Sequence, residues 1–156
     1  MKETAGDLLE LDRQVCFGLA VASRSVIGIY RPILEPLGLT HPQYLVMLAL
    51  WGSAPLRFGE LAHMLRLDPA TLSPLVKRLE HSGLVERIPA EGDERTFCLG
   101  PTEAGWALRE QALGVPPAVI KRLGLPVERL LALRDELTAV IAAVDGPEEL
   151  DEQRDE

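Results

Sequence analysis

The sequence predicts a mainly α-helical protein that carries one small β-hairpin. Three observations indicate this fold class. Apolar residues recur at helical spacing near both ends of the 156-residue chain, and two short helical segments follow each other closely in the middle. Directly after them come two strand-like runs on either side of a loop that contains Pro, Gly and Asp. At this length we expect residues 1–144 to form a single domain with its own core.

The first predicted helix covers residues 8–36, where Pro32 is expected to kink it and Pro36 and Gly38 to end it. Residues 102–144 hold a second helical region with an apolar stripe near its end. Because the apolar face of the first helix is wider than one small core requires, we expect both regions to be dimerisation helices that pack on a second copy of the chain. The first stripe contains Leu8, Leu11, Val15, Leu19, Ala22, Val26, Ile29 and Ile33.

The segment between these helices, residues 41–100, carries clear start and stop signals. A helix begins near Pro42, and Asp68 is a good N-cap for a further helix with Pro69 at its first position. Gly83 suits the C-terminal end of that helix. The strand-like runs "LVERI" and "RTFCLG" then flank the loop "PAEGDE". Helix, helix and hairpin in this order predict a winged helix-turn-helix.

The helix predicted over residues 69–82 has one apolar and one polar face. Small residues at its N-terminal end would let it enter a DNA groove closely, and its hydroxyl and cationic side chains can contact bases or phosphates. The alternative is an ordinary amphipathic helix with a solvated polar face, but the hairpin that follows favours a recognition helix. The candidate DNA-binding residues here are Asp68, Ala70, Thr71, Ser73, Pro74, Lys77 and Arg78.

The predicted hairpin tip, "EGDER", adds Asp93 and Arg95 to the candidate DNA-binding residues. An arginine at this place could enter a narrow minor groove, with the neighbouring acid holding its side chain. The alternative is a surface turn with a weak salt bridge. The tip also contains Glu91 and Glu94, which would repel phosphate unless they turn away from it.

The net charge of −8 is unevenly distributed along the chain. The last twelve residues, 145–156, hold seven acids and one base, so they account for −6 of the total. We expect this acidic tail to be disordered. The other 144 residues carry 15 bases and 17 acids and contain no strongly basic segment. DNA binding would therefore depend on local geometry and not on bulk charge.

Composition also argues against several classes of protein. No apolar run approaches the roughly 20 residues that span a bilayer, and "MKETAGDLLELDR" does not resemble a signal peptide. We therefore expect a cytoplasmic protein without membrane contact. Two cysteines in a reducing compartment predict no structural disulfide, and three histidines far apart in the sequence do not form a zinc motif. No metal or other cofactor is expected.

Several stretches together resemble the MarR family of bacterial transcriptional regulators. "DPATLSPLVKRLEHSGLVERIPAEGDERTFCLGPTEAG" is similar to the recognition helix and wing of that family, and "YRPILEPLGLTHPQYLVMLALW" is similar to its organic-hydroperoxide-sensing repressors. The resemblance covers about residues 10–110. It implies a homodimer joined by the terminal helices, which holds two winged modules against a palindromic operator of double-stranded DNA.

The resemblance also assigns Cys16 the place of the peroxide-sensing cysteine and Tyr30 that of a tyrosine near the sensor thiol. If the first helix is continuous, Tyr30 lies roughly 21 Å along the axis from Cys16, so it would serve the thiol of the partner subunit. Two positions depart from the family: Ala20 and His41 stand where tyrosines are expected. The imidazole of His41 could hydrogen-bond to or pair with a thiolate. Oxidation by an organic hydroperoxide would then lead to a mixed disulfide with a low-molecular-weight thiol.

Other functions remain open at this point. Cys16 could be a small buried hydrophobe, and the chain could instead respond to a phenolic or other small ligand in the dimer crevice. An activated thiol would also suit a thiol peroxidase, although no resolving cysteine follows Cys16 and we expect no enzyme. A winged-helix module that binds another protein instead of DNA would also be compatible with the negative net charge. Cys98, in the second predicted strand, is expected to be a buried structural residue.

Overall fold

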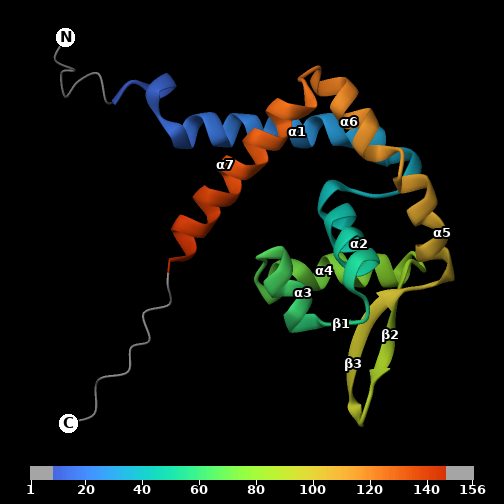
Figure 1. Ribbon diagram of the computed structural model, residues 1–156. Helices are drawn as coiled ribbons and strands as arrows, with labels where there is room; N and C mark the ends of the chain where they lie inside the picture. Colours follow the sequence, from blue (N-terminus) through green and yellow to red (C-terminus); the bar gives the residue numbers. More distant parts are fainter. Residues whose placement is uncertain (1–8, 147–156) are drawn as a thin grey trace, which may run out of the picture. The chain divides into compact units, whose positions relative to one another are not determined.

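The computed structural model describes residues 9–146, without the side chain of Glu94. Its elements confirm a mainly helical protein with one small sheet (Figure 1). The chain divides into two compact units between Arg122 and Leu123. The elements are α1 (Val15–Leu34), α2 (His41–Ser53), β1 (Leu56–Arg57), α3 (Phe58–Leu65), α4 (Pro69–His81), β2 (Val85–Ala90), β3 (Asp93–Pro101), α5 (Glu103–Ala112), α6 (Val115–Leu123) and α7 (Val127–Asp145). Most of the acidic tail predicted at 145–156 lies outside the described residues.

Helix α1 starts later than its apolar pattern predicts. A 3-10 turn at Leu11–Arg13 precedes it, and Gln14 between the two is extended, with ψ 120°. The prediction of a helix from residue 8 is therefore wrong at its N-terminal end, because spacing alone does not register one extended residue. Its other end comes two residues before the predicted residue 36: α1 stops at Leu34, a 3-10 turn follows at Glu35–Leu37, and Gly38 takes the left-handed conformation at φ 69°.

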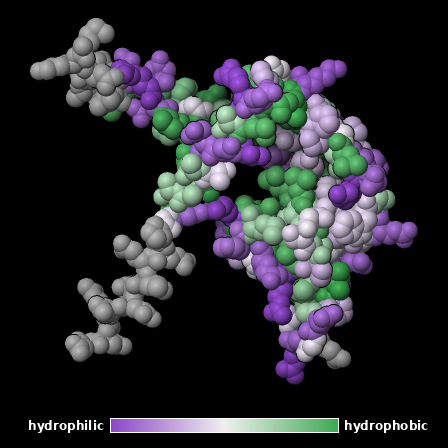
Figure 2. All heavy atoms as spheres, viewed as in Figure 1, coloured by the Kyte–Doolittle hydropathy of each residue, from purple (hydrophilic) through white to green (hydrophobic). Residues whose placement is uncertain are grey.

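Leu34 is the one buried residue of α1. Large apolar side chains along it are exposed in the single chain, among them Phe17 at 36% and Ile27 at 42% (Figure 2). By length and composition, Val15–Leu37 could also cross a membrane, which the sequence analysis did not anticipate. A helix that packs against another protein can have the same length and apolar composition. The exposed apolar surface therefore indicates that α1 needs a partner to cover it.

The core of the first unit lies where α2, α3 and α4 meet the sheet. Helix α2 opens with a capping box, in which the Thr40 hydroxyl accepts from the Gln43 amide and the Gln43 side chain accepts from the Thr40 amide at 2.9 Å. Helices α3 and α4 then form the predicted helix-turn-helix. The fully buried side chains are Leu34, Val46, Met47, Leu50, Leu61, Leu72, Leu79, Leu99 and Val115.

The sheet has three antiparallel strands in the order β1–β3–β2. The hairpin β2–β3 is the predicted wing, but it is longer than expected. Ala90 pairs with Asp93, so the loop predicted over 89–94 shrinks to Glu91 and Gly92. Gly92 has φ 82°, which lets the chain turn this tightly. The two-residue strand β1 was not predicted, because it is too short to show alternation.

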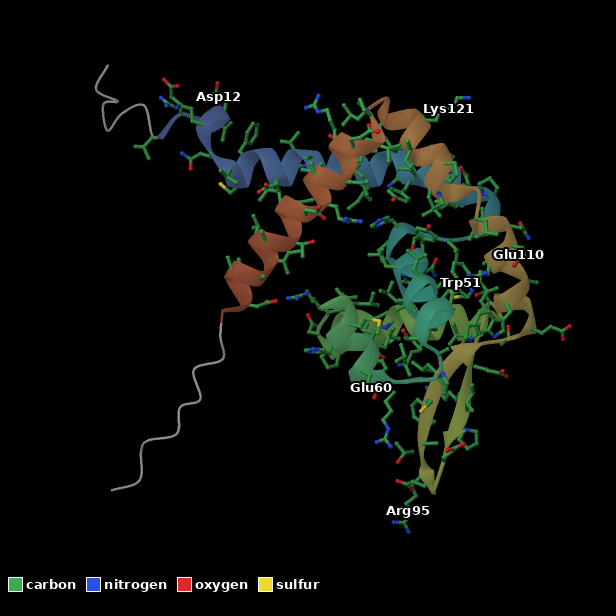
Figure 3. All side chains as sticks on the ribbon, viewed as in Figure 1. Asp12, Trp51, Glu60, Arg95, Glu110 and Lys121 are labelled. Atoms are coloured by element: carbon green, nitrogen blue, oxygen red, sulfur yellow. The ribbon has the colours of Figure 1, made fainter. Side chains whose placement is uncertain are left out.

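Helix α5 is tied to the sheet and to α2. The Thr102 amide donates to the Leu84 carbonyl at 3.1 Å, and the Trp51 indole donates to the Gly105 carbonyl at 2.9 Å (Figure 3). A Cβ on Gly105 would lie 2.2 Å from the Leu84 carbonyl oxygen. Only glycine therefore allows this close approach of α5 to the end of the helix-turn-helix.

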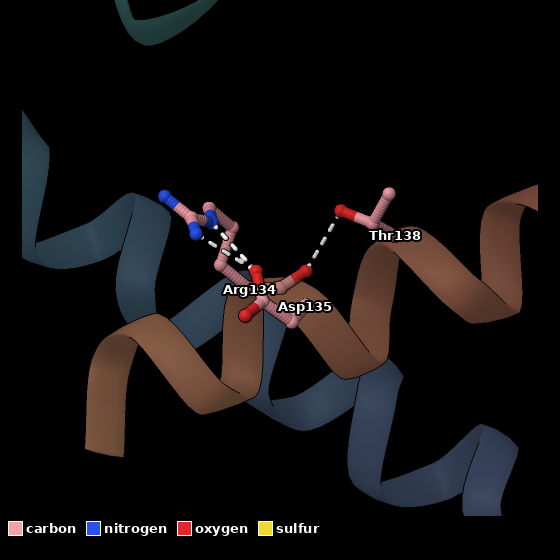
Figure 4. A network of polar contacts seen from close by, with 3 residues as sticks. All are labelled: Arg134, Asp135 and Thr138. Atoms are coloured by element: carbon pink, nitrogen blue, oxygen red, sulfur yellow. Dashed lines mark hydrogen bonds and ion pairs between the residues drawn. The ribbon is translucent and has the colours of Figure 1, made fainter. Parts of the chain in front are cut away.

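The second unit consists mainly of α7, none of whose residues is buried. Two neighbouring polar contacts lie within this helix: Arg134 donates to the Asp135 carboxylate at 2.8 and 3.0 Å, and the Thr138 hydroxyl donates to the Arg134 carbonyl (Figure 4). Both members of the ion pair are about two-thirds exposed. Such a pair contributes little to stability, so α7 by itself has no core.

Candidate nucleic-acid interface and cysteine site

The outer face of α4 is available for contact with a ligand. Leu72, Leu75, Val76 and Leu79 are buried against the rest of the unit. The residues predicted to face outward are exposed, except that Ser73 is half-buried. These are Ala70, Thr71, Ser73, Pro74, Lys77 and Arg78.

Asp68 acts as the N-cap of α4. One of its carboxylate oxygens accepts from the Thr71 amide at 2.8 Å, and the other accepts from the Thr71 hydroxyl at 3.0 Å. These hydrogen bonds to the charged form hold the pKa of Asp68 below its usual range. Asp68 thus sets the start of the helix, and the exposed Thr71 hydroxyl, which donates its proton to Asp68, can only accept a further hydrogen bond.

Asp93 stabilises the turn of the wing. Its carboxylate accepts from the Arg95 amide at 2.9 Å and from the Thr96 hydroxyl at 2.5 Å, and these bonds lower its pKa. The contact between Asp93 and Arg95 is thus made through the Arg95 backbone, not through the guanidinium as the sequence analysis expected. The Arg95 side chain extends from the tip of the hairpin into solvent (Figure 3). An exposed cation at this tip is suited to a groove or a phosphate.

Cys16 is the second residue of α1 and is exposed. It therefore lies in the first turn of the helix, not deeper inside it as a start at residue 8 would imply. Because α1 is continuous from Val15 to Leu34, Tyr30 lies roughly 21 Å along the axis from Cys16. A single chain does not bring these two residues together.

Tyr30 and His41 do come together. Their ring centroids are 4.9 Å apart at an interplanar angle of 64°, and Tyr44 lies 6.0 Å from Tyr30. Burial lowers the pKa of His41 and raises the pKa of Tyr30. At neutral pH the imidazole is therefore uncharged and the phenol protonated, so both can hydrogen-bond but neither carries charge. Burial by itself thus disfavours the charged imidazole that an ion pair between His41 and a thiolate would need.

A pocket of about 450 Å³ opens beside this aromatic group. Ile27, Leu39 and His41 line it, together with the charged side chains Arg31 and Glu35. The sequence analysis singled out neither Arg31 nor Tyr44, although both lie in the stretch that resembles the family.

The remaining candidate positions have simpler surroundings. Ala20 is exposed on α1. Cys98 is half-buried in β3, where it pairs with Arg57 on one side and Ile88 on the other. Among residues 9–146, no group of three His, Cys, Asp or Glu side chains could hold a metal ion.

The comparisons with known proteins decide the family. Residues 39–97 match the MarR family. The chain is also 38% identical, over 118 residues, to an organic hydroperoxide resistance transcriptional regulator of Bacillus subtilis, which covers 76% of this chain and 80% of that protein. This chain belongs to the MarR family. It is therefore a DNA-binding transcriptional regulator with the winged helix-turn-helix fold of that family.

Solved structures of MarR proteins agree with this fold. Reduced AbfR bound to DNA superposes with a TM-score of 0.70 at 29% identity and covers 92% of this chain and all of that one. CouR from Rhodococcus jostii, bound to p-coumaroyl-CoA, superposes with a TM-score of 0.72 at 29% identity, over 85% of this chain and 94% of that one. Proteins similar to this chain thus include an organic hydroperoxide resistance regulator and a protein that holds p-coumaroyl-CoA.

Proposed function

We propose that this MarR regulator is an organic-hydroperoxide-sensing repressor that acts in the cytoplasm. It binds a palindromic operator as a homodimer and releases the DNA when Cys16 is oxidised. The observation that carries the proposal is the separation of the site's parts: an exposed thiol stands at one end of α1, and the Tyr30–His41 pair lies at the other end beside an open pocket. A second copy of the chain would bring the parts together.

The proposed DNA interface consists of the outer face of α4 and the tip of the wing. Ser73 and Lys77 would contact base edges or phosphates in a major groove, and the Thr71 hydroxyl, whose proton goes to Asp68, would accept a hydrogen bond from a base edge. Arg95 would enter the adjacent minor groove. In a dimer, two recognition helices would sit roughly 34–36 Å apart, about one turn of DNA.

The proposed dimer pairs two α1 helices in antiparallel fashion. A two-fold axis that crosses α1 near Ser23 would place Cys16 of the partner subunit opposite Tyr30. The exposed apolar side chains of Phe17, Val21 and Ile27 would then be covered at the same seam. This arrangement accounts for an apolar helix that buries almost nothing in its own chain.

The proposed chemistry takes place at the sulfur of Cys16. Its thiolate attacks an oxygen of the hydroperoxide, the O–O bond breaks, and the sulfur becomes a sulfenic acid while the alkoxide takes up a proton to leave as an alcohol. A low-molecular-weight thiol then condenses with the sulfenic acid, which forms a mixed disulfide and releases water. The protonated Tyr30 hydroxyl and the neutral His41 imidazole are suited to donate a hydrogen bond to the thiolate of the partner subunit.

Oxidation would act on DNA binding through packing. A bulky disulfide adds polar volume to the dimer seam, and overpacking of this kind costs about 1–3 kcal/mol. Because about 1.4 kcal/mol changes an equilibrium tenfold, two such sites per dimer could move the recognition helices out of operator spacing.

The test is a gel shift on DNA from upstream of the protein's own gene, with and without cumene hydroperoxide and a thiol. The parent is expected to bind and then to release the DNA. Cys16→Ser should bind equally well and keep the DNA, whereas Cys98→Ser should behave like the parent. Release of DNA by the Cys16→Ser protein on hydroperoxide treatment would contradict the sensor role.

A second candidate function is a regulator that responds to a small organic ligand. The pocket beside His41 supports it, since an apolar wall at Ile27 and Leu39 faces the cation of Arg31. Under this alternative, an aromatic carboxylate would release the DNA from the parent and from Cys16→Ser alike. Arg31→Gln should then abolish the response, and hydroperoxide should have no effect on either protein.

A further inference from the structure

The wing is joined to the recognition helix through one side chain. Arg87 of β2 donates from its Nε to a carboxylate oxygen of Glu80, in the last turn of α4, at 2.7 Å. The guanidinium carbon of Arg87 also lies 4.4 Å from the centre of the Phe97 ring in β3. Arg87 thus touches α4 and both strands of the hairpin at the same time.

The strand register shows where along the wing this contact lies. Val85 pairs with Pro101, Arg87 with Leu99, and Pro89 with Phe97, so these residues share one face of the hairpin. Val85 and Leu99 at the base of that face are buried. On this face, Arg87 is therefore the first exposed residue of β2 outward from the buried Val85.

Beyond Arg87, the hydrogen bonds of the Asp93 carboxylate are internal to the hairpin. Asp93 accepts from Arg95 and Thr96, and these bonds shape the turn without connecting it to α4. The angle between the wing and the recognition helix is thus set by the Arg87 contact together with the pairing of β3 with β1, at Leu56–Leu99 and Arg57–Cys98. The charge of Arg57 also acts on Asp93 at the tip.

The energetic effect of such a contact differs between folding and binding. The Arg87 side chain is 52% exposed and that of Glu80 is 22% exposed, and exposed ion pairs contribute little to folding stability. A contact that already holds two binding elements in their bound orientation raises affinity more, because the entropic cost of ordering them is not incurred on binding. Stacking of the guanidinium on Phe97 restricts it further.

We propose that Glu80 and Arg87 are positioning residues for operator binding, which hold the wing at the angle where its tip and α4 reach adjacent grooves together. The inference rests on the proposed contact of the wing tip with DNA. Neither residue needs to touch a base. Glu80 acts through Arg87, and Arg87 acts through the orientation of the hairpin.

Glu80 provides the sharpest test, because its charge and its proposed role predict opposite results. A carboxylate near DNA repels phosphate, so its removal alone should strengthen binding. If Glu80 holds the wing, Glu80→Gln should instead weaken operator binding, by about three- to tenfold, the range expected when one or two side chains must be ordered on binding. The matched control is Glu86→Gln, which removes the same charge from an exposed acid on β2.

The experiment measures binding of the full chain to a labelled duplex from upstream of its own gene and to a scrambled duplex of the same length, by fluorescence anisotropy. We expect Glu80→Gln to lose affinity for the upstream duplex only, and Glu86→Gln to bind both duplexes as well as or better than the parent. Hydroxyl-radical footprinting of Glu80→Gln should lose protection of the flanking minor grooves and keep the central protection. Tight binding by Glu80→Gln with a complete footprint would overturn the inference.

Two further variants separate positioning from folding and from direct contact. The charge swap Glu80→Arg with Arg87→Glu should recover most of the affinity that Arg87→Glu alone loses, at an unchanged thermal midpoint. Failure to recover would mean that Arg87 contacts DNA itself and would contradict the inference.

Arg95→Ala separates the contact of the wing tip with DNA from the positioning of the wing by Glu80 and Arg87. If Arg95→Ala weakens binding and Glu80→Gln does not, the wing binds DNA but Glu80 and Arg87 do not position it. If Arg95→Ala has no effect on binding, the proposed contact of the wing tip with DNA is wrong, and the inference that rests on it is overturned as well.

Discussion

The winged-helix region and the first helix differ in how much apolar surface this chain buries by itself. Helix α2 alone buries five residues, whereas the longer α1 buries only Leu34. Both helices have similar compositions, so hydrophobicity does not separate them. The core of the DNA-binding part is therefore formed within one chain, whereas α1 presents an apolar surface that the described part of this chain does not cover.

The largest expected effect comes from the core of the complete region. Leu50 is fully buried, so Leu50→Ala should lower the free energy of unfolding by about 2–5 kcal/mol, measured by urea titration. The effect should not depend on protein concentration.

Leu19 on α1, which is 39% exposed, is the matched comparison. Leu19→Ala should cost the single chain little, but it should weaken the proposed dimer, so that its thermal midpoint rises with protein concentration. A loss as large as that of Leu50→Ala, and independent of concentration, would remove the contrast between the two helices.

The next effect concerns the junction that holds α5 against the helix-turn-helix. A methyl group on Gly105 would meet the Leu84 carbonyl oxygen at 2.2 Å, and this backbone atom cannot move aside easily. Gly105→Ala should therefore destabilise the protein by about 1–3 kcal/mol, measured by denaturant unfolding. In contrast, Gly52→Ala in α2, where no atom lies within 4 Å of the new methyl group, should stabilise by about 0.5–1 kcal/mol. Equal losses for both variants would contradict the close approach.

The third effect tests the wing as part of the DNA-binding region. Arg95→Ala should weaken binding to the upstream duplex about tenfold and lower the slope of log affinity against log salt by about one. Arg109→Ala removes the same charge from α5 and serves as the control. Anisotropy titrations at several salt concentrations measure both, and an unchanged slope for Arg95→Ala would exclude a contact with phosphate.

The smallest effect concerns His41, at the boundary between the two regions. Burial lowers the pKa of His41 below its value of about 6.5 in an unfolded chain. The unfolded state therefore binds more protons as the pH falls through 6.5, and the folded protein loses stability there. The parent's free energy of unfolding should fall more steeply between pH 7 and pH 5 than that of His41→Gln. Parallel curves would mean that His41 is solvated in the folded protein.

Much of the DNA-binding region could be predicted from the sequence, because its signals are local. The start of α4 follows from Asp68 and Pro69, and its end from the left-handed Gly83 at φ 75°. The buried face of α4 follows from helical periodicity. The start of α1 could not be predicted in this way, because the apolar spacing runs on through Gln14 although the backbone there is extended.

The candidate sites, too, could be predicted from the sequence only in part. Cys16, Tyr30 and His41 were recognised by resemblance, and the contact between Tyr30 and His41 joins two separate helices. Capping, turns and periodicity act within about four residues, so the sequence by itself determined the order and type of the elements from α2 to β3, with the exception of β1, and with the family comparison the class of protein. Only the tertiary structure decided that His41 lies against Tyr30 and that Arg87 ties the wing to α4, because such contacts depend on the angles at which separate elements pack. No spacing along the chain encodes those angles.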